Sequence, residues 1–196
     1  DLESLDEAKL RGPQVIRHRY RAVTIEDYEW LALKASGNVG RAKCLKTPRR
    51  EGEVTVLILP GAEQDARDLT KKPVAAPELL RRVQDFLDER RLVTTRLRVG
   101  KPRFVEVSVR VSVVLKASGP GVERVKQRLE DAIRNALHPL FGGADGKGWP
   151  YGRDVHKSDL YRVVEGMEGI DYVEDLVLFD EDLGRSVVEV KTREDE

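Results

Sequence analysis

The sequence predicts an α+β protein built from two small lobes, each an antiparallel sheet with amphipathic helices packed on one face. One observation is the strict alternation in residues 104–115, FVEVSVRVSVVL, where valines point one way and polar side chains the other, as in a strand with one wet face. A second is the segment 120–137, whose apolar residues recur at the period of a helix lying on a core. Antiparallel pairing follows, because parallel strands are usually buried on both faces and do not alternate.

The first lobe is expected over residues 17–100, after a flexible and charged lead-in at 1–16. Its first helix begins with a capping box, in which Thr24 is the N-cap and Asp27 the third helical residue. Pro77 suits the first turn of a second helix. The expected elements are a helix at 25–35, strands at 39–45 and 53–59, a helix at 77–90 and a strand at 92–99.

The second lobe is expected over residues 101–196, and Ser158 is the expected N-cap of its short helix. The expected elements are a strand at 104–115, a helix at 120–137, a helix at 158–167 and a hairpin of strands at 170–179 and 186–192. The core-facing residues of the first strand and the long helix are expected to be Val105, Val107, Val109, Val111, Val113, Leu115, Val122, Val125, Leu129, Ile133, and Ala136 or Leu137. Residues 24–45 and 156–178 share an order of capped helix, glycine stop, strand and hairpin partner, which indicates a distant internal repeat.

The composition of the chain argues against several kinds of partner and site. The chain has 196 residues, and its 35 Lys and Arg balance its 35 Asp and Glu, so no overall field attracts nucleic acid or an anionic membrane. Cys44 is the only cysteine, which excludes an internal disulfide, and its place in a strand favours a buried structural thiol over a nucleophile. Neither a membrane-spanning run nor a signal peptide is predicted. The chain begins at Asp1 rather than Met, as a piece of a longer protein would.

One segment concentrates glycines, prolines, histidines, aspartates and a tryptophan: HPLFGGADGKGWPYGRDVHKSDLY, residues 138–161. It lacks the glycine and the Ser or Thr that a phosphate-binding loop requires around Gly-Lys, and its acids are too sparse for an EF-hand. For a hydrolase the candidates would be Ser158, His156 and Asp159, which lie too close in sequence to converge as nucleophile, base and orienting group. The spacing therefore favours a structural loop over a catalytic one.

A stiff, shape-specific loop at residues 141–153 explains this composition better. Glycines permit positive φ and close backbone approach, prolines fix φ, and aromatic side chains provide large contact area at low entropic cost. Rigid aromatic loops on a charged surface are typical anchors of protein interfaces. The candidate interface residues are Gly142, Gly143, Gly148, Trp149, Pro150, Tyr151, Gly152 and Arg153.

These residues carry a resemblance to a known family. The motifs are His138 to Leu140, Gly142 with Gly143, Gly148 to Pro150, and Gly152 with Arg153. In this order they resemble the C-terminal segment of the baseplate J-like family, the baseplate assembly proteins of contractile phage tails and related injection systems. Residues 19–45, RYRAVTIEDYEWLALKASGNVGRAKCL, and 101–115, KPRFVEVSVRVSVVL, are similar to other blocks of the family. The resemblance covers most of residues 17–180, and the Gly-Trp-Pro block is its specific part.

The resemblance implies a structural wedge protein used in virion or particle assembly, not an enzyme, with no cofactor and no metal. Its implied partners are other baseplate J-like subunits, in a homo- or hetero-oligomer, together with hub, sheath-adaptor and other wedge proteins, with no nucleic acid and no membrane insertion. Assembly would take place in the cytoplasm, and subunit contacts would close the baseplate ring and link hub to sheath. Trp149 and Tyr151 are then expected at or beneath a subunit contact; the alternative is that they pin the loop to its own domain.

Two other classes stay open. A ferredoxin-like module that binds a small ligand or RNA has a similar alternation of strands and helices. An RNA-binding sheet displays aromatic side chains on its open face, however, and the wet face of the strand at 104–116 has only Phe104 at its start. A metal-dependent enzyme would use His138, His156 and Asp154, whose spacing matches no standard pair of ligands on a helix or strand.

Overall fold

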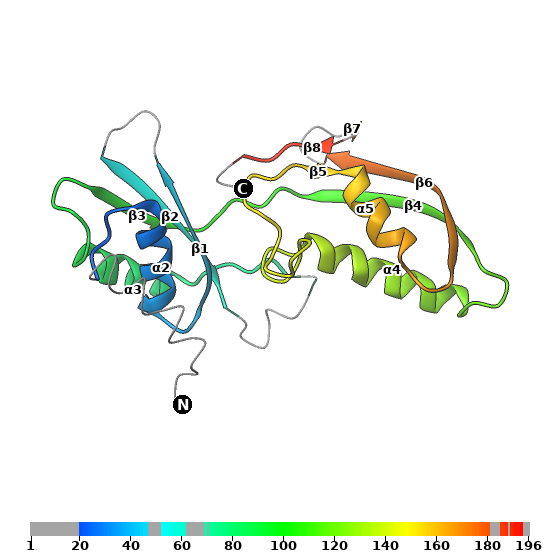
Figure 1. Cartoon of the computed structure of the whole chain (residues 1–196), viewed down its shortest axis with the longest axis horizontal. Coiled ribbons are helices and arrows are strands. Elements are labelled where there is room, and N and C mark those ends of the chain that lie inside the picture. The colour runs from blue at the N-terminus through cyan, green and yellow to red at the C-terminus, as the bar shows by residue number, and fades with distance from the viewer. Residues whose placement is uncertain are drawn as a thin grey trace. The chain divides into compact units, whose positions relative to one another are not determined.

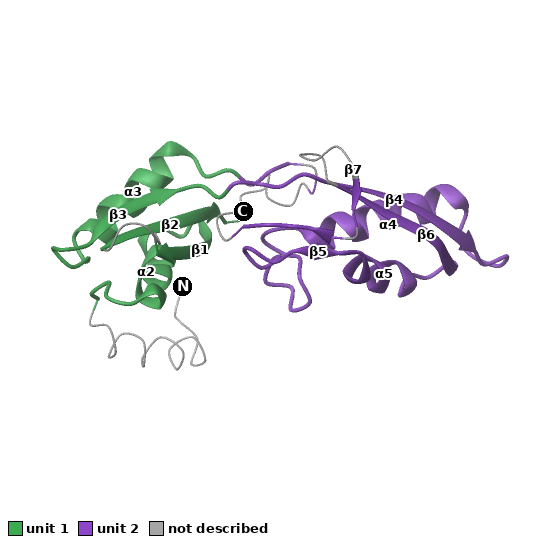
Figure 2. Ribbon diagram, turned by 90° about the horizontal axis from the view of Figure 1, so that it is seen from above, with its two compact units in different colours: residues 1–63, 74–102 green, residues 64–73, 103–196 purple. Residues whose placement is uncertain are grey.

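The computed structural model describes residues 20–46, 52–61, 69, 71–180, 185–187 and 189–193, so the predicted lead-in at 1–16 lies outside the described residues. The chain divides into two compact units, Asp1–Glu63 with Val74–Pro102 and Gln64–Pro73 with Arg103–Glu196 (Figure 2). The predicted α+β class is confirmed, with small sheets and helices in each unit. The division into domains at residue 100 stays a prediction, because a compact unit need not fold independently.

Over its described residues, the first unit has a three-stranded sheet and two helices (Figure 1). Its elements are α2 (Ile25–Ala35), β1 (Val39–Lys46), β2 (Glu53–Pro60), α3 (Pro77–Asp88) and β3 (Arg96–Gly100), with strands in the order β1-β2-β3. β1 and β2 form the predicted antiparallel hairpin, whereas β3 runs parallel to β2. The expectation of a purely antiparallel sheet was wrong here, because helix α3 carries the chain back across the sheet before β3 begins.

The predicted capping box of α2 is present. The Thr24 hydroxyl accepts from the Asp27 backbone N–H at 3.3 Å, and the Asp27 carboxylate accepts from the Thr24 N–H at 2.8 Å and the Val23 N–H at 3.1 Å. These bonds satisfy backbone groups that a helix start leaves without partners. One face of α2 and α3 packs on the sheet, and the core includes Leu31, Val56, Ile58, Val83 and Leu87, each 0% exposed.

In the part of the second unit that the structure describes, there are two helices and two small sheets. Its elements are β4 (Val107–Leu115), α4 (Val122–Leu137), β5 (Val155–His156), α5 (Lys157–Glu165), β6 (Ile170–Asp180), β7 (Arg185–Val187) and β8 (Glu189–Val190). The larger sheet has the order β4-β6-β7 and is antiparallel, and the smaller pairs β5 with β8. The predicted strand at 186–192 is therefore two short strands, of which only β7 continues the hairpin with β6.

The core of the second unit lies between the β4–β6 sheet and the two helices, which cover the same face (Figure 1). Leu160, Val164, Leu176 and Leu178 are 0% exposed, and the predicted valine row of β4 packs against them from Val107 onward. Two residues that were predicted to face the core do not belong to it. Val122 is 70% exposed because it lies in the first turn of α4, and Val105 precedes the strand.

The start of α5 corrects another prediction. The N-cap is His156 rather than Ser158, because Asp159 then occupies the third helical position, from which its carboxylate accepts from the His156 N–H at 3.3 Å. Both α2 and α5 thus begin with a capping box that ends in aspartate, and each precedes a strand with an antiparallel partner. The order of elements agrees with the proposed repeat.

Candidate functional site: the glycine-rich loop

The glycine-rich loop, residues 138–153, folds back onto the C-terminal end of α4. The His138 carbonyl accepts from the Gly142 N–H at 2.9 Å and from the Trp149 N–H at 3.0 Å. The Gly143 N–H donates to the Ala136 carbonyl at 2.9 Å, and the Gly148 N–H donates to the Gly142 carbonyl at 2.8 Å. The last carbonyls of a helix have no partner within the helix. N–H groups of the loop donate to these carbonyls, and the same hydrogen bonds fix the loop backbone.

Two kinds of backbone constraint explain why glycines recur here. A Cβ on Gly142 would lie 2.4 Å from the Ala136 carbonyl oxygen and 2.6 Å from that of His138, closer than any side chain can approach. Gly143, Gly148 and Gly152 have φ of 76°, 93° and 67°, in the left-handed region that other residues rarely adopt. The loop conformation therefore depends on glycine at these sites.

Arg153 connects the loop to α5. Its guanidinium lies 4.6 Å from the centre of the Trp149 ring, and its Nη2 donates to Asp159 Oδ1 at 2.7 Å. The Trp149 indole N–H in turn donates to the Arg153 carbonyl at 2.9 Å. The Asp159 side chain is only 11% exposed, so this charged hydrogen bond is shielded from water and stronger than a surface pair. Asp159, which the sequence suggested only as the orienting group of a hydrolase triad, is thus a structural anchor of the loop.

His138 is buried at the base of the loop, with 4% of its surface exposed. Its Nδ1 accepts from the Leu140 N–H at 3.1 Å, and its ring stacks on Phe141 with centroids 4.8 Å apart. Because Nδ1 is an acceptor, the proton of the neutral ring lies on Nε2, for which the described residues offer no hydrogen-bond partner. Burial lowers the pKa of His138. This histidine is therefore a neutral packing residue.

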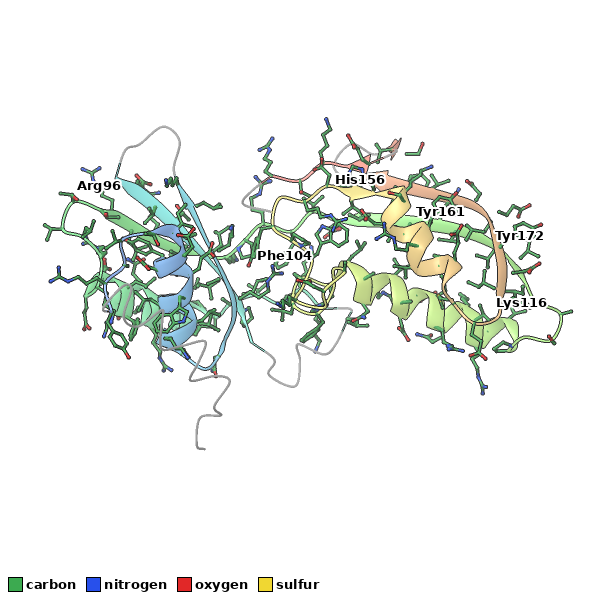
Figure 3. All side chains as sticks on the ribbon, in the orientation of Figure 1. Arg96, Phe104, Lys116, His156, Tyr161 and Tyr172 are labelled. Atoms are coloured by element: carbon green, nitrogen blue, oxygen red, sulfur yellow. The ribbon has the colours of Figure 1, made fainter. Side chains whose placement is uncertain are left out.

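The proposed metal ligands do not come together in the structure. Asp154 Oδ1 accepts from the Thr192 N–H at 2.8 Å, and His156 Nδ1 lies 3.3 Å from Glu189 Oε2. Figure 3 labels His156 at the junction of β5 and α5. Across the described ranges, no group of three or more His, Cys, Asp or Glu side chains is arranged to hold a metal ion. Each of the three residues instead has a structural contact of its own or is buried.

The most exposed part of the loop is its tip. Ala144, Asp145, Gly146 and Lys147 are exposed, as is Pro150, whereas Trp149 and Tyr151 are half-buried. The Asp145 carboxylate accepts from the Lys147 N–H at 3.2 Å and so stabilises the turn. Sequence reasoning emphasised the aromatic residues and missed this tip, although its small and charged residues between glycines are a recognisable signal for an exposed turn.

The wet face of the larger sheet bears on the RNA-binding alternative. Phe104 lies before β4, and Tyr172 lies on β6 opposite Val114 (Figure 3). A second aromatic residue of β6, Phe179, lies opposite Ser108. Tyr172 and Phe179 are seven residues apart, or roughly 20 Å along an extended strand, too far to stack successive bases. This spacing does not favour RNA binding.

Cys44 is buried, as the sequence indicated, with 2% of its surface exposed. Burial and then the Glu29 carboxylate raise the pKa of its thiol to about 12. Glu29 Oε1 also accepts from the Cys44 N–H at 3.0 Å. A thiol that stays protonated at neutral pH is a poor nucleophile. Cys44 is therefore a packing residue of the core of the first unit.

Comparison with known proteins shows a likeness to solved structures. No family model and no curated protein matches this chain. Among solved structures, it is similar to a chain in a 6-fold symmetrised cryo-EM structure of the anti-feeding prophage (AFP) baseplate, with a TM-score of 0.75 and 17% sequence identity. The match covers 98% of this chain and 40% of the baseplate chain, so this chain spans less than half of the neighbour's length. At this identity the likeness shows a shared fold; membership of the baseplate J-like family stays a prediction. No helix in the described residues is long and apolar enough to cross a membrane.

Proposed function

We propose that this chain is a structural component of the baseplate of a contractile tail or injection system. The observation that carries the proposal is the fold, which a chain of the AFP baseplate shares over 98% of this sequence. The finer assignment is a wedge subunit whose contacts with neighbouring subunits close the baseplate ring and link hub to sheath. It would assemble in the cytoplasm, contact hub and sheath-adaptor proteins, and carry out no catalysis.

The glycine-rich loop is the proposed subunit contact. Its tip is exposed, while its base is held by hydrogen bonds to α4 and by the Arg153–Asp159 pair. A loop that is already ordered loses little conformational entropy on binding, so more of its contact energy appears as affinity. The half-buried Trp149 and Tyr151 would complete the contact at its rim.

The proposal can be tested by reversing one charge at the tip. Lys147 is exposed, and its side chain is not used in the hydrogen bonds that hold the loop. Lys147→Glu should reduce the yield of complete, sheathed particles seen by electron microscopy when it replaces the parent gene in producing cells. The matched control is Lys126→Glu, which reverses a charge on the exposed side of α4.

Both variants should fold like the parent, which circular dichroism and thermal melting would check. Fewer complete baseplates with Lys147→Glu, and normal numbers with Lys126→Glu, would support the loop as an assembly contact. Equal particle yields from both variants would contradict the loop contact. Normal particles from cells that lack the gene altogether would contradict the baseplate role itself.

A further inference from the structure

A turn of the first unit, residues 92–95, displays apolar side chains to solvent. The Thr95 N–H donates to the Leu92 carbonyl at 3.0 Å across the turn. The Arg91 guanidinium fixes the turn, because it donates to the Thr95 carbonyl at 2.6 Å and to Asp88 Oδ1 of α3 at 2.6 Å. At the tip, Val93 is 97% exposed and Leu92 is 40% exposed. An exposed apolar tip on an ordered turn is suited to anchor a partner.

Positive charge flanks this turn. Arg96 follows it at the start of β3 (Figure 3). On the neighbouring segment, Arg21 precedes Ala22, which pairs with Arg91 in a parallel bridge. Both Arg21 and Arg96 are exposed, and neither forms an ion pair within the part of the chain that the structure describes. The sequence has the same bias, because residues 90–103, RRLVTTRLRVGKPR, contain six Lys and Arg and no Asp or Glu. The turn therefore has an apolar tip and a basic rim.

The second unit displays a surface of the opposite charge. Tyr172 of β6 is 55% exposed and lies opposite the partly buried Val114 of β4 (Figure 3). Residues 165–175, EGMEGIDYVED, contain five acidic residues and no Lys or Arg. All five are exposed, and among the described residues only Glu168 has an ion pair, with Arg128 at 3.3 Å. This Tyr172 surface is therefore an exposed aromatic ring with an acidic rim.

We propose that the turn at residues 92–95 of one copy docks on the Tyr172 surface of a second copy of the same chain. The two surfaces match in apolar content and in charge: the apolar tip covers the tyrosine ring, while Arg21 and Arg96 meet the acidic residues beside it. Each chain has both surfaces, so a contact between two different faces can repeat from copy to copy, in a ring or in a filament. The inference does not depend on the proposed baseplate role.

Charge favours a second copy over a polyanion as the partner. Nucleic acid or an anionic membrane would be attracted to the basic rim of the turn but repelled by the acidic residues at 165–175. A second copy uses both surfaces at once. The contact is small, so we expect a dissociation constant in the micromolar to millimolar range. Because the charges are exposed, dissolved salt should screen them and weaken the contact.

Two single substitutions break one surface each. Arg96→Glu places an acid against the acidic rim, and Tyr172→Ser removes the aromatic ring. Both side chains are exposed, and circular dichroism would check that the variants fold. The surface left intact on each variant fits the surface left intact on the other, so an equimolar mixture should form a one-to-one dimer that cannot grow further. Arg81→Glu, which reverses an exposed charge on α3, is the matched control and should associate like the parent.

Sedimentation equilibrium measures this association in the full chain. The weight-average mass of the parent should rise with protein concentration up to about 0.5 mM, and it should fall when salt is added. Arg96→Glu and Tyr172→Ser should each increase the dissociation constant by roughly tenfold or more, and their mixture should regain the parent affinity for one contact. A parent that stays monomeric, a variant that associates like the parent, or a mixture that stays monomeric would overturn the proposal. Lys147→Glu should leave the association unchanged, which separates this test from that of the baseplate role.

Discussion

Replacing Gly142 with alanine should destabilise the second unit by roughly 3 kcal/mol. The new Cβ would lie 2.4, 2.6 and 2.7 Å from the carbonyl oxygens of Ala136, His138 and Asn135. All three are backbone atoms at the end of α4, so no side-chain rotation can relieve the contact. The loop would have to move away and lose three hydrogen bonds: Gly142 N–H to His138, Gly143 N–H to Ala136, and Gly148 N–H to Gly142. At about 1 kcal/mol each, these account for the expected loss.

Urea unfolding followed by tryptophan fluorescence measures this loss. The chain has two tryptophans, so a Trp30→Phe background leaves Trp149, in the loop, as the reporter. The matched control is Gly166→Ala, where φ is −75° and the nearest atom to a new Cβ, the Arg162 carbonyl oxygen, is at an ordinary 3.5 Å. Gly166→Ala should change the free energy of unfolding by less than about 1 kcal/mol. A loss with Gly142→Ala no larger than with this control would refute the account of the loop.

Three further predictions concern individual side chains. Because burial holds the pKa of Cys44 near 12, the thiol should resist Ellman's reagent at pH 8 until denaturant is added; rapid labelling of the folded protein would contradict this. Burial lowers the pKa of His138 in the folded protein, whereas in the unfolded chain this pKa is about 6.5. Below pH 6.5 the unfolded chain therefore binds a proton that the folded protein does not, and the free energy of unfolding should fall by up to about 1.4 kcal/mol per pH unit. Above pH 6.5 His138 is neutral in both states and should have no such effect. His138→Gln should lack that slope in unfolding measured between pH 5 and 7, and an unchanged slope would contradict the assignment. Arg153→Ala should cost about 1–2 kcal/mol of unfolding free energy, against less than about 0.5 for Arg134→Ala, whose pair with Glu130 is on the surface; equal losses would argue against Arg153 as an anchor.

Local signals in the sequence predicted most elements of the fold. The capping box at Thr24 and Asp27 fixes the start of α2 through bonds between residues three apart, and the structure has it where expected. The alternation of valines likewise placed the core-facing side of β4 correctly from Val107 onward. Both features depend on neighbours in the chain, which a single sequence displays.

Features set by distant contacts were not predictable in this way. The parallel partner of β3 depends on where α3 returns the chain, and the pairing of β8 with β5 joins segments more than thirty residues apart. In the loop, the need for glycine could be predicted from composition, but its reasons could not. The closeness of Gly142 to the end of α4, and the anchoring of Arg153 by Asp159, arise only when the loop folds back.

The central claim, that the chain belongs to a baseplate, is tested most directly by locating it on particles. Contractile particles would be purified from cells that produce a tagged copy, and the tag would be labelled with gold and viewed by electron microscopy. The account predicts label at one end of the sheathed tube, in the plate, on most particles. A tagged protein that is expressed and soluble but absent from intact particles would contradict it.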